Sequence, residues 1–251
     1  MADKLSEKDI ENINIEATEE YAVMPLRNTV LFPQQVIPIY IGREKSLKLI
    51  SDLELEKRKY IIVVAQEDGS IEDPSTEDLY SYGTLATVLK VFAMPDNSKS
   101  AIVQGIARVK ILDYLEKEPY FKAAASKVSD EPVADQLEID DIVDNLRTSF
   151  SDLIKVAPNL TEEHTGMLSN IKKPNRLVDR AISLMTLPNQ EKQEILEEVN
   201  IKNRIDKAVS IINREIQRIK LGEEIQTEVH DEIAKTQREY YLREQMKAIQ
   251  K

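Results

Sequence analysis

The sequence contains no cysteine and no tryptophan, and only six glycines and two histidines among its 251 residues. Without cysteine, disulfide bonds and thiolate chemistry are excluded, and a reducing compartment, the cytoplasm, is the expected location. The two histidines, His164 and His230, fall in different predicted helices. A metal site needs more ligands at defined spacing, so we predict two solvated histidines and no metal.

Long apolar runs and phosphate-binding loops are also missing. No segment approaches the roughly 20 apolar residues that cross a bilayer, so we expect no membrane span, and no signal peptide follows the first basic residue. No glycine is followed by lysine, which excludes the GK[ST] end of a P-loop, and no serine–lysine pair stands out as catalytic. We therefore expect no catalytic residues and no cofactor in this chain, and neither ATP hydrolysis nor cleavage of casein by it.

The net charge of −11 is unevenly distributed along the chain. Residues 1–20 hold seven acids and two bases, and residues 129–200 hold fifteen acids and seven bases. Residues 201–251 hold nine acids and eleven bases, a balance typical of a solvated helix. Because the acidic regions would repel a phosphate backbone, nucleic-acid binding is not expected.

Residues 1–20 are predicted to form an acidic, disordered tail, and residues 21–129 a β-rich lobe with a single helix in REKSLKLISDLELEK. The predicted strands are YAVMPL, NTVLFPQQVIPIYIG, YIIVVAQ, TLATVLKVFAM, SAIVQGIARVKILDYLE and YFKAAASKV. The turn formers in PDNSK join two of them into a hairpin, and Gly105 inside a strand indicates a bulge or a close backbone approach. The expected fold is α+β, with a curled or barrel-like sheet.

From residue 130 the pattern becomes helical, which predicts a helical bundle over residues 130–222. Its helices are expected in LEIDDIVDNLRTSFSDLIKVA, TEEHTGMLSNI, KKPNRLVDRAISLM and PNQEKQEILEEV, followed by a long fifth helix from Ile201. The composition changes at SDEPVADQ, which we interpret as a linker between two lobes with separate hydrophobic cores. Limited proteolysis is expected to cut before Tyr21 and then near residues 129–136.

The fifth helix is predicted to leave the bundle. Apolar residues recur every three or four positions up to Ile219, then thin to a narrow stripe after Gly222. Residues 223–251 would project by about 43 Å, at about 1.5 Å per residue. The chain stops inside this pattern, so we expect a piece of a longer protein, with this helix leading to an absent domain. We expect the projecting part to fray unless something packs on it.

Two sets of residues are candidates for contact with a partner or substrate. Leu31, Phe32 and Pro33 are either core or part of an exposed edge open to an extended peptide, since Pro33 removes one ladder hydrogen bond. Apolar side chains on the projecting helix are the second set: Tyr240, Tyr241, Met246 and Ile249. Contact with another subunit is favoured there over direct substrate contact, and packing on a neighbouring domain is a third interpretation.

Arg27 has a different expected role. Its guanidinium is expected to connect loops by donating hydrogen bonds to backbone carbonyls.

Three segments carry a family resemblance. They are MPLRNTVLFPQQVIPIYIGREKS from Met24, GTLATVLKVFAMPDNSKSAIVQGIARVKIL from Gly83 and KTQREYYLREQMKAIQK from Lys235. Between them lie KPNRLVDRAISLM and EKQEILEEVNIKNRIDKAVSII. In this order and spacing, residues 21–251 resemble the N-terminal region of the ATP-dependent Lon protease. Met24 stands where leucine is usual in that family, and the tail before Tyr21 has no counterpart.

The resemblance implies the substrate-recognition and assembly region of a hexameric protease. A P-loop ATPase that uses ATP and Mg²⁺ and a serine–lysine peptidase would follow in the full-length enzyme, and this fragment alone would associate weakly. Unfolded, damaged or short-lived regulatory proteins would be its substrates. The alternative is a stand-alone receptor or scaffold of the same fold without enzymatic activity. A third function, RNA binding by the barrel-like lobe, is disfavoured by the acidic charge.

Overall fold

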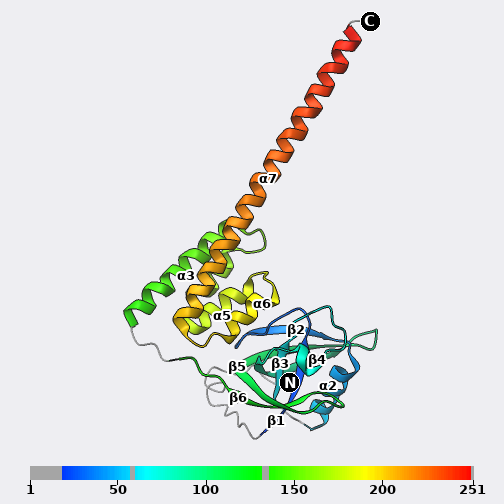
Figure 1. Cartoon of the computed structure of the whole chain (residues 1–251), viewed down its shortest axis with the longest axis vertical. Coiled ribbons are helices and arrows are strands. Elements are labelled where there is room, and N and C mark those ends of the chain that lie inside the picture. Colours follow the sequence, from blue (N-terminus) through cyan, green and yellow to red (C-terminus); the bar gives the residue numbers. More distant parts are fainter. Residues whose placement is uncertain (1–18, 57–59, 132–135, 250–251) are drawn as a thin grey trace.

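Six strands form one mixed sheet in the computed structural model, which describes residues 19–56, 60–131 and 136–249 (Figure 1). The strands are β1 (Glu20–Leu26), β2 (Val36–Ile41), β3 (Tyr60–Ala65), β4 (Tyr82–Ala93), β5 (Lys99–Glu116) and β6 (Lys122–Lys127). Their order is β2-β5-β4-β3-β1-β6, and β6 also pairs with β5. β1 and β3 are parallel and every other pair is antiparallel. The sheet therefore curls back on itself, as the sequence predicted.

The predicted hairpin joins β4 and β5, and Gly105 has both of its predicted roles. The register between the two strands shifts at Leu85/Ala86, so that Ala86 pairs with Gly105 and a bulge forms beside it. The Gly105 N–H donates to the Gln35 carbonyl at 2.9 Å, and the Gly105 carbonyl accepts from the Gln34 N–H at 2.9 Å. A Cβ at Gly105 would lie 2.3 Å from the Phe32 carbonyl oxygen, so only glycine fits there.

The prediction of strand over NTVLFPQQ is wrong. Residues 27–35 form an irregular connection, and regular pairing begins only at Val36. Gln34 adopts φ of 65°, which leaves the extended region and follows directly after Pro33. The β-branched and aromatic composition of this segment reflects burial of its side chains rather than strand pairing. Gln34 and Gln35 instead bond to the bulge of β5.

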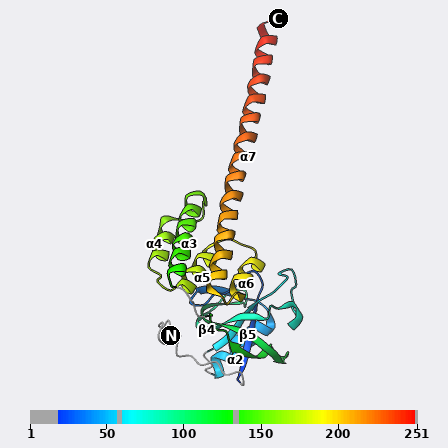
Figure 2. The ribbon, with the colours of Figure 1, turned by 60° about the vertical axis from the view of Figure 1, so that its left-hand side comes forward.

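The helices follow the predicted ranges closely. The first lobe contains the helix α2 (Glu44–Glu56) and a short 3₁₀ turn, η1 (Thr76–Asp78). The bundle contains α3 (Gln136–Val156), α4 (Glu162–Ser169), α5 (Pro174–Leu184) and α6 (Asn189–Glu197) (Figure 2). The last helix, α7 (Ile201–Ile249), has 49 residues and passes through Gly222 without a break. Asn200 caps it, because its side-chain oxygen accepts from the Asn203 N–H at 3.1 Å.

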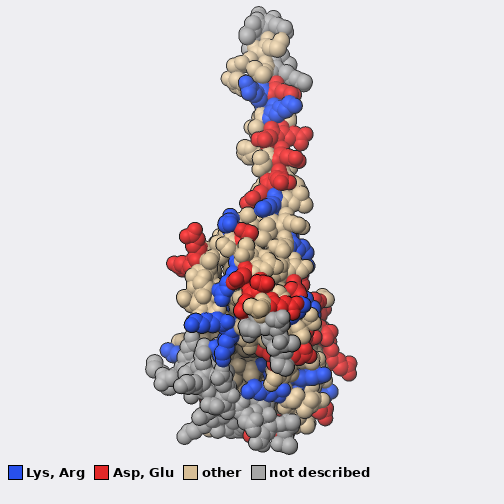
Figure 3. All heavy atoms as spheres, turned by 90° about the vertical axis from the view of Figure 1, so that its left-hand side faces the viewer, with Lys and Arg blue, Asp and Glu red and all other residues tan. Residues whose placement is uncertain are grey.

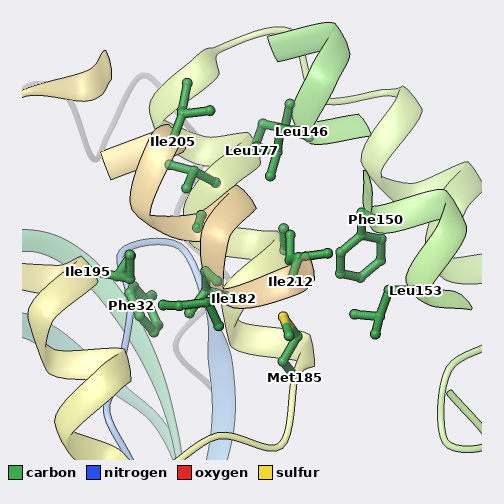
Figure 4. Packing of buried hydrophobic residues seen from close by; sticks show 14 of the residues in the cluster. Phe32, Leu146, Phe150, Leu153, Leu177, Ile182, Met185, Ile195, Ile205 and Ile212 are labelled. Atoms are coloured by element: carbon green, nitrogen blue, oxygen red, sulfur yellow. The ribbon is translucent and has the colours of Figure 1, made fainter. Parts of the chain in front are cut away.

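The cores of the two lobes are not fully separate, which corrects part of the expectation from the linker. Two clusters of buried residues lie within the first lobe alone, and a third joins the first lobe to the bundle. One cluster of buried residues contains most of the bundle interior and also Val30, Phe32 and Ala65 from the first lobe. Figure 4 shows Phe32 beside Ile195 of α6 and Ile182 of α5, with Phe150 of α3 facing Ile212 of α7. The irregular connection before β2 thus carries Phe32 out of the sheet and into the bundle. Residues 132–135 of the predicted linker lie outside the described residues.

Candidate polypeptide-binding and assembly surfaces

A buried arginine fixes the first turn of α7. Arg204 is fully buried, and its guanidinium donates to Asp130 at 2.5 Å and to the Glu198 carbonyl at 2.6 Å. Asp179 of α5 lies 3.8 Å from another nitrogen of the same guanidinium. Because a buried guanidinium is costly without partners, this set of contacts holds the base of α7 in one position.

A second buried arginine joins the sheet to the same cluster. Arg108 of β5 donates to the Asp179 carboxylate at 2.5 Å and to the Leu196 carbonyl at 2.9 Å. Asp179 therefore lies between an arginine from the sheet and an arginine from α7. The sequence offered a signal for Arg204, since it shares a helix face with Ala208 and Ile212, but none for its partners.

The carboxylate of Asp130 completes this junction. It accepts from Arg204 on one oxygen and from the Asn175 amide, at 2.7 Å, on the other. Burial alone would raise the pKa of Asp130, but the Arg204 charge and these hydrogen bonds outweigh it and hold the pKa below its usual value. Asp130 is therefore a charged anchor between α7, α5 and the segment that follows β6.

Polar side chains of α6 and the loops add contacts between the lobes. The Gln193 amide donates to the Tyr82 carbonyl at 3.0 Å, and the Asn189 amide donates to the Arg27 carbonyl at 3.2 Å. Arg27 itself donates to the carbonyls of Gly69 and Ser70, as its predicted loop-tying role requires. The lobes are thus held by a shared core and by a polar junction.

Among the described residues, the distal part of α7 carries more large exposed apolar side chains than any other helix or strand. Leu221, Ile225, Val229 and Ile233 recur every four residues and are each at least half exposed. A step of four residues turns the stripe by about 40° around the helix, because a turn takes 3.6 residues. Acidic and basic side chains surround these apolar positions along the projecting helix (Figure 3).

The predicted contact residues at the far end of α7 are exposed. Tyr240, Tyr241 and Met246 have exposed fractions of 68%, 63% and 60%. The helix includes Ile249, whose side chain lies outside the described residues. Large apolar side chains exposed together on one helix are typical of a surface that contacts another polypeptide. Their role in such a contact stays a prediction.

The other predicted contact residues lie in the interior. Leu31 and Phe32 are 3% and 0% exposed. They therefore belong to the core, which was the first of the two interpretations, and not to an exposed edge. Pro33 is partly buried beside them. Among the strands that the structure describes, β2 is the edge strand, because its one partner is β5. Pro38 occupies its centre and lacks an N–H, which disfavours the addition of a further strand.

A smaller apolar surface lies on the β4–β5 hairpin. Tyr40 of β2 and Phe92 of β4 pair with the same residue, Ser100 of β5, and so lie in one row across three strands. Both are exposed, as is the neighbouring Met94. Lys90 places its ammonium 4.6 Å from the centre of the Phe92 ring. Sequence analysis did not single out these residues, because the row forms only when the strands pair.

Two further observations concern metal binding and membrane crossing. Within residues 19–56, 60–131 and 136–249, no three His, Asp or Glu side chains are gathered closely enough to hold a metal ion. His164 closes the first turn of α4 by contacts with Thr161. Among the helices of the same residues, none combines the length and apolar character that crossing a bilayer requires.

The fold and its surfaces define a two-lobed unit that carries a long helix, anchored at its base and with an exposed apolar stripe. Residues 20–214 match the family described as the ATP-dependent protease La (LON) substrate-binding domain. The chain belongs to this LON substrate-binding domain family.

Two relatives illustrate the extent of the similarity. The Lon protease of Dictyoglomus thermophilum is 39% identical over 233 residues, which are 93% of this chain and 29% of that protein. The Lon protease of Koribacter versatilis is 40% identical over 230 residues, which are 91% of this chain and 28% of that protein. The chain therefore spans less than a third of the length of these curated relatives.

Solved structures agree on the fold. The N-terminal domain of a Mycobacterium avium complex Lon protease matches with a TM-score of 0.64 at 18% identity, over 78% of this chain and 98% of that chain. A Lon N-terminal domain protein from Xanthomonas campestris matches with a TM-score of 0.55 at 13% identity, over 76% and 98%. At these identities the likeness shows the fold alone.

Proposed function

We propose that this chain is the substrate-recognition and assembly region of an ATP-dependent serine protease that degrades unfolded, damaged or short-lived regulatory proteins. The observation that carries the proposal is the exposed apolar stripe on α7, held at its base by Arg204 and the shared core. Membership of a substrate-binding family and similarity to Lon proteases support it.

In this proposal the chain contributes binding and positioning. ATP and Mg²⁺, and the serine peptidase chemistry, belong to parts of the full-length enzyme outside this chain. The full-length protein assembles as a homo-hexamer in the cytoplasm, and the side chains of Tyr240, Tyr241, Met246 and Ile249 contact a neighbouring subunit. The chain alone associates weakly, because the ATPase ring that would fix the geometry is not part of it.

The second candidate is a stand-alone receptor or scaffold with the same fold and no enzyme attached. The exposed stripe on α7 favours the first candidate, because it is more easily explained by a partner domain or subunit. The length of the natural gene product decides between the two candidates. Continuation into a P-loop and a serine–lysine peptidase supports the protease, and a stop near residue 251 supports the receptor or scaffold. Casein cleavage or ATP hydrolysis by the purified chain itself would contradict both.

The proposal is tested by binding to an unfolded protein. Fluorescently labelled α-lactalbumin, permanently unfolded by reduction and carboxymethylation, is titrated with the chain and followed by anisotropy. The native, folded form of the same protein is the matched control. We expect saturable binding of the unfolded form and none of the folded form. Equal binding of both forms, or binding of neither, would contradict the proposal.

A further inference from the structure

A cleft opens where β1 passes the start of α2. Its volume is about 400 Å³, within the range of roughly 300–1,000 Å³ that is usual for ligand pockets. The surface is mostly apolar and combines side chains from four separate parts of the chain: Val23, Pro25, Leu49, Pro74, Tyr120 and Phe121. These four parts, residues 23–25, 42–49, 72–74 and 120–121, are well separated in sequence, so the cleft exists only in the folded lobe.

The apolar wall around Phe121 is held on several sides. The Val23 N–H donates to the Phe121 carbonyl at 2.8 Å, which joins β1 to the residues before β6. The Phe121 ring packs edge-on against Tyr114, with ring centres 5.9 Å apart. The Lys45 ammonium lies 5.7 Å from the centre of the Phe121 ring. A wall held in this way is preformed, and binding there does not have to order it first.

Charged residues surround the opening, and carboxylates outnumber the cations. Glu44, Glu72 and Asp73 line the cleft together with Arg43 and Lys45. Lys45 forms an ion pair with Glu118 at 2.8 Å, and Arg43 donates to the Gln66 side chain at 2.7 Å. The hydrogen bond to Glu118 raises the pKa of Lys45, so its charge is matched within the chain. Glu44 and Glu72 are exposed at the rim and give it a negative balance.

We propose that this cleft takes one aromatic or branched apolar side chain of an extended, unfolded polypeptide that carries lysine or arginine beside it. The inference rests on the proposed function and locates its substrate site. The apolar floor removes the incoming side chain from water, and the carboxylate rim favours flanking cations. The Tyr40–Phe92 row does not line this cleft, and the centre of β2 is blocked by Pro38.

Short labelled peptides test the chemistry directly. The probe is a fluorescein-labelled peptide of glycine and serine with Lys-Phe-Lys at its centre, titrated with the whole chain. Replacing its phenylalanine by alanine is expected to weaken binding by about tenfold or more, because burial of the ring is lost. Replacing its two lysines by glutamates is expected to weaken binding by roughly two- to fivefold for each charge.

A charge reversal at the rim tests the location. Glu72→Lys should weaken the binding of the lysine-flanked peptide and strengthen the binding of the glutamate-flanked peptide. The preference of the chain for lysine over glutamate beside the phenylalanine would then be reversed. Glu67→Lys is the matched control, because Glu67 is exposed on the same acidic segment and does not line the cleft. Both positions are at the surface, so neither change disturbs the core. An unchanged preference in Glu72→Lys, or an equal change in Glu67→Lys, would overturn the proposal.

Photo-cross-linking gives the decisive result. The peptide phenylalanine is replaced by a diazirine analogue of leucine, and adducts are mapped by mass spectrometry. We expect adducts on Val23, Pro25, Leu49 and Phe121. Adducts mainly on Tyr40 and Phe92, or on α7, would contradict the assignment of the cleft as the peptide-binding site. The proposed function, binding of unfolded protein, would still stand. If the wild-type chain binds no unfolded protein at all, the proposed function and the cleft both fail.

Discussion

The guanidinium of Arg108, on the sheet, lies 2.5 Å from the carboxylate of Asp179, on a bundle helix, with both side chains 5% exposed. Arg204 of α7 approaches the same carboxylate at 3.8 Å. The three residues come from strand, helix and projecting helix, so none of these parts moves independently without exposing or breaking a buried ion pair. The two lobes are therefore expected to unfold as one unit.

Asp179→Asn should lower the free energy of unfolding by about 3–5 kcal/mol, because it leaves the buried charge of Arg108 without its partner. Urea denaturation followed by circular dichroism measures the change. Lys155→Ala is the control, since it removes an exposed pair with Asp152 in which the two side chains are 69% and 52% exposed. That control should change stability by less than about 1 kcal/mol. Equal effects of the two substitutions would show that the buried pair has no special role.

Phe32→Ala should destabilise the whole chain by about 3–5 kcal/mol and keep a single unfolding transition, because its ring fills the core shared by both lobes. Phe92→Ala is the matched control: Phe92 is 39% exposed on the sheet, and its loss should cost about 1 kcal/mol or less. Differential scanning calorimetry measures both variants. Two resolved transitions in Phe32→Ala, with only one shifted, would mean that the lobes have independent cores after all.

Asp130 should make the junction sensitive to acid. Its pKa is lowered in the folded state, so its contribution is complete above the unfolded-state value of 3.8 and is lost as the pH falls through the folded-state pKa. Asp130→Asn should therefore be less stable than the wild type at about pH 6, and the gap should narrow toward about pH 3. Urea denaturation of both proteins across this pH range measures the gap. A gap that is constant with pH would contradict the assignment of Asp130 as a charged anchor.

Ending the chain after Gly222 should leave the melting temperature almost unchanged, because the described side chains beyond that point are all exposed. In the monomeric full chain, amides of residues 235–249 should exchange hydrogen much faster than those of residues 201–219. Local propensity and ion pairs of about 0.2–0.5 kcal/mol each are all that stabilise the outer turns. Equal protection of the two stretches, measured without self-association, would show that the outer helix is stable on its own.

The sequence predicted most of the elements because their signals are local. The 3.6-residue spacing identified every bundle helix, and the turn formers between β4 and β5 identified the hairpin. Gly105 was informative for the same reason, since a lone glycine in a strand marks a place where a side chain does not fit. The exposed face of α7 also followed from spacing alone.

Contacts between residues far apart in the sequence could not be predicted from local patterns. VLF before Pro33 has the composition of a strand, and only the tertiary structure shows that Phe32 leaves the sheet and packs on α5 and α6. Fully separate cores were expected because the composition changes near residue 130, but composition does not reveal that one of the three buried clusters includes side chains of both lobes. Arg108, Asp130, Asp179 and Arg204 are spread over nearly one hundred residues, and the cleft is assembled from equally distant segments.

Hydrogen exchange with and without an unfolded protein tests the central claim, that this chain binds unfolded polypeptide through a preformed site. The first N–H groups of a helix have no intrahelical acceptor, so the amides of Glu44, Lys45 and Ser46 are sensitive reporters beside the cleft. At saturating carboxymethylated α-lactalbumin, we expect slower exchange at residues 42–49 and 120–121, and no change at residues 201–212 in the core. Unchanged exchange at 42–49 and 120–121 under saturation would contradict the account.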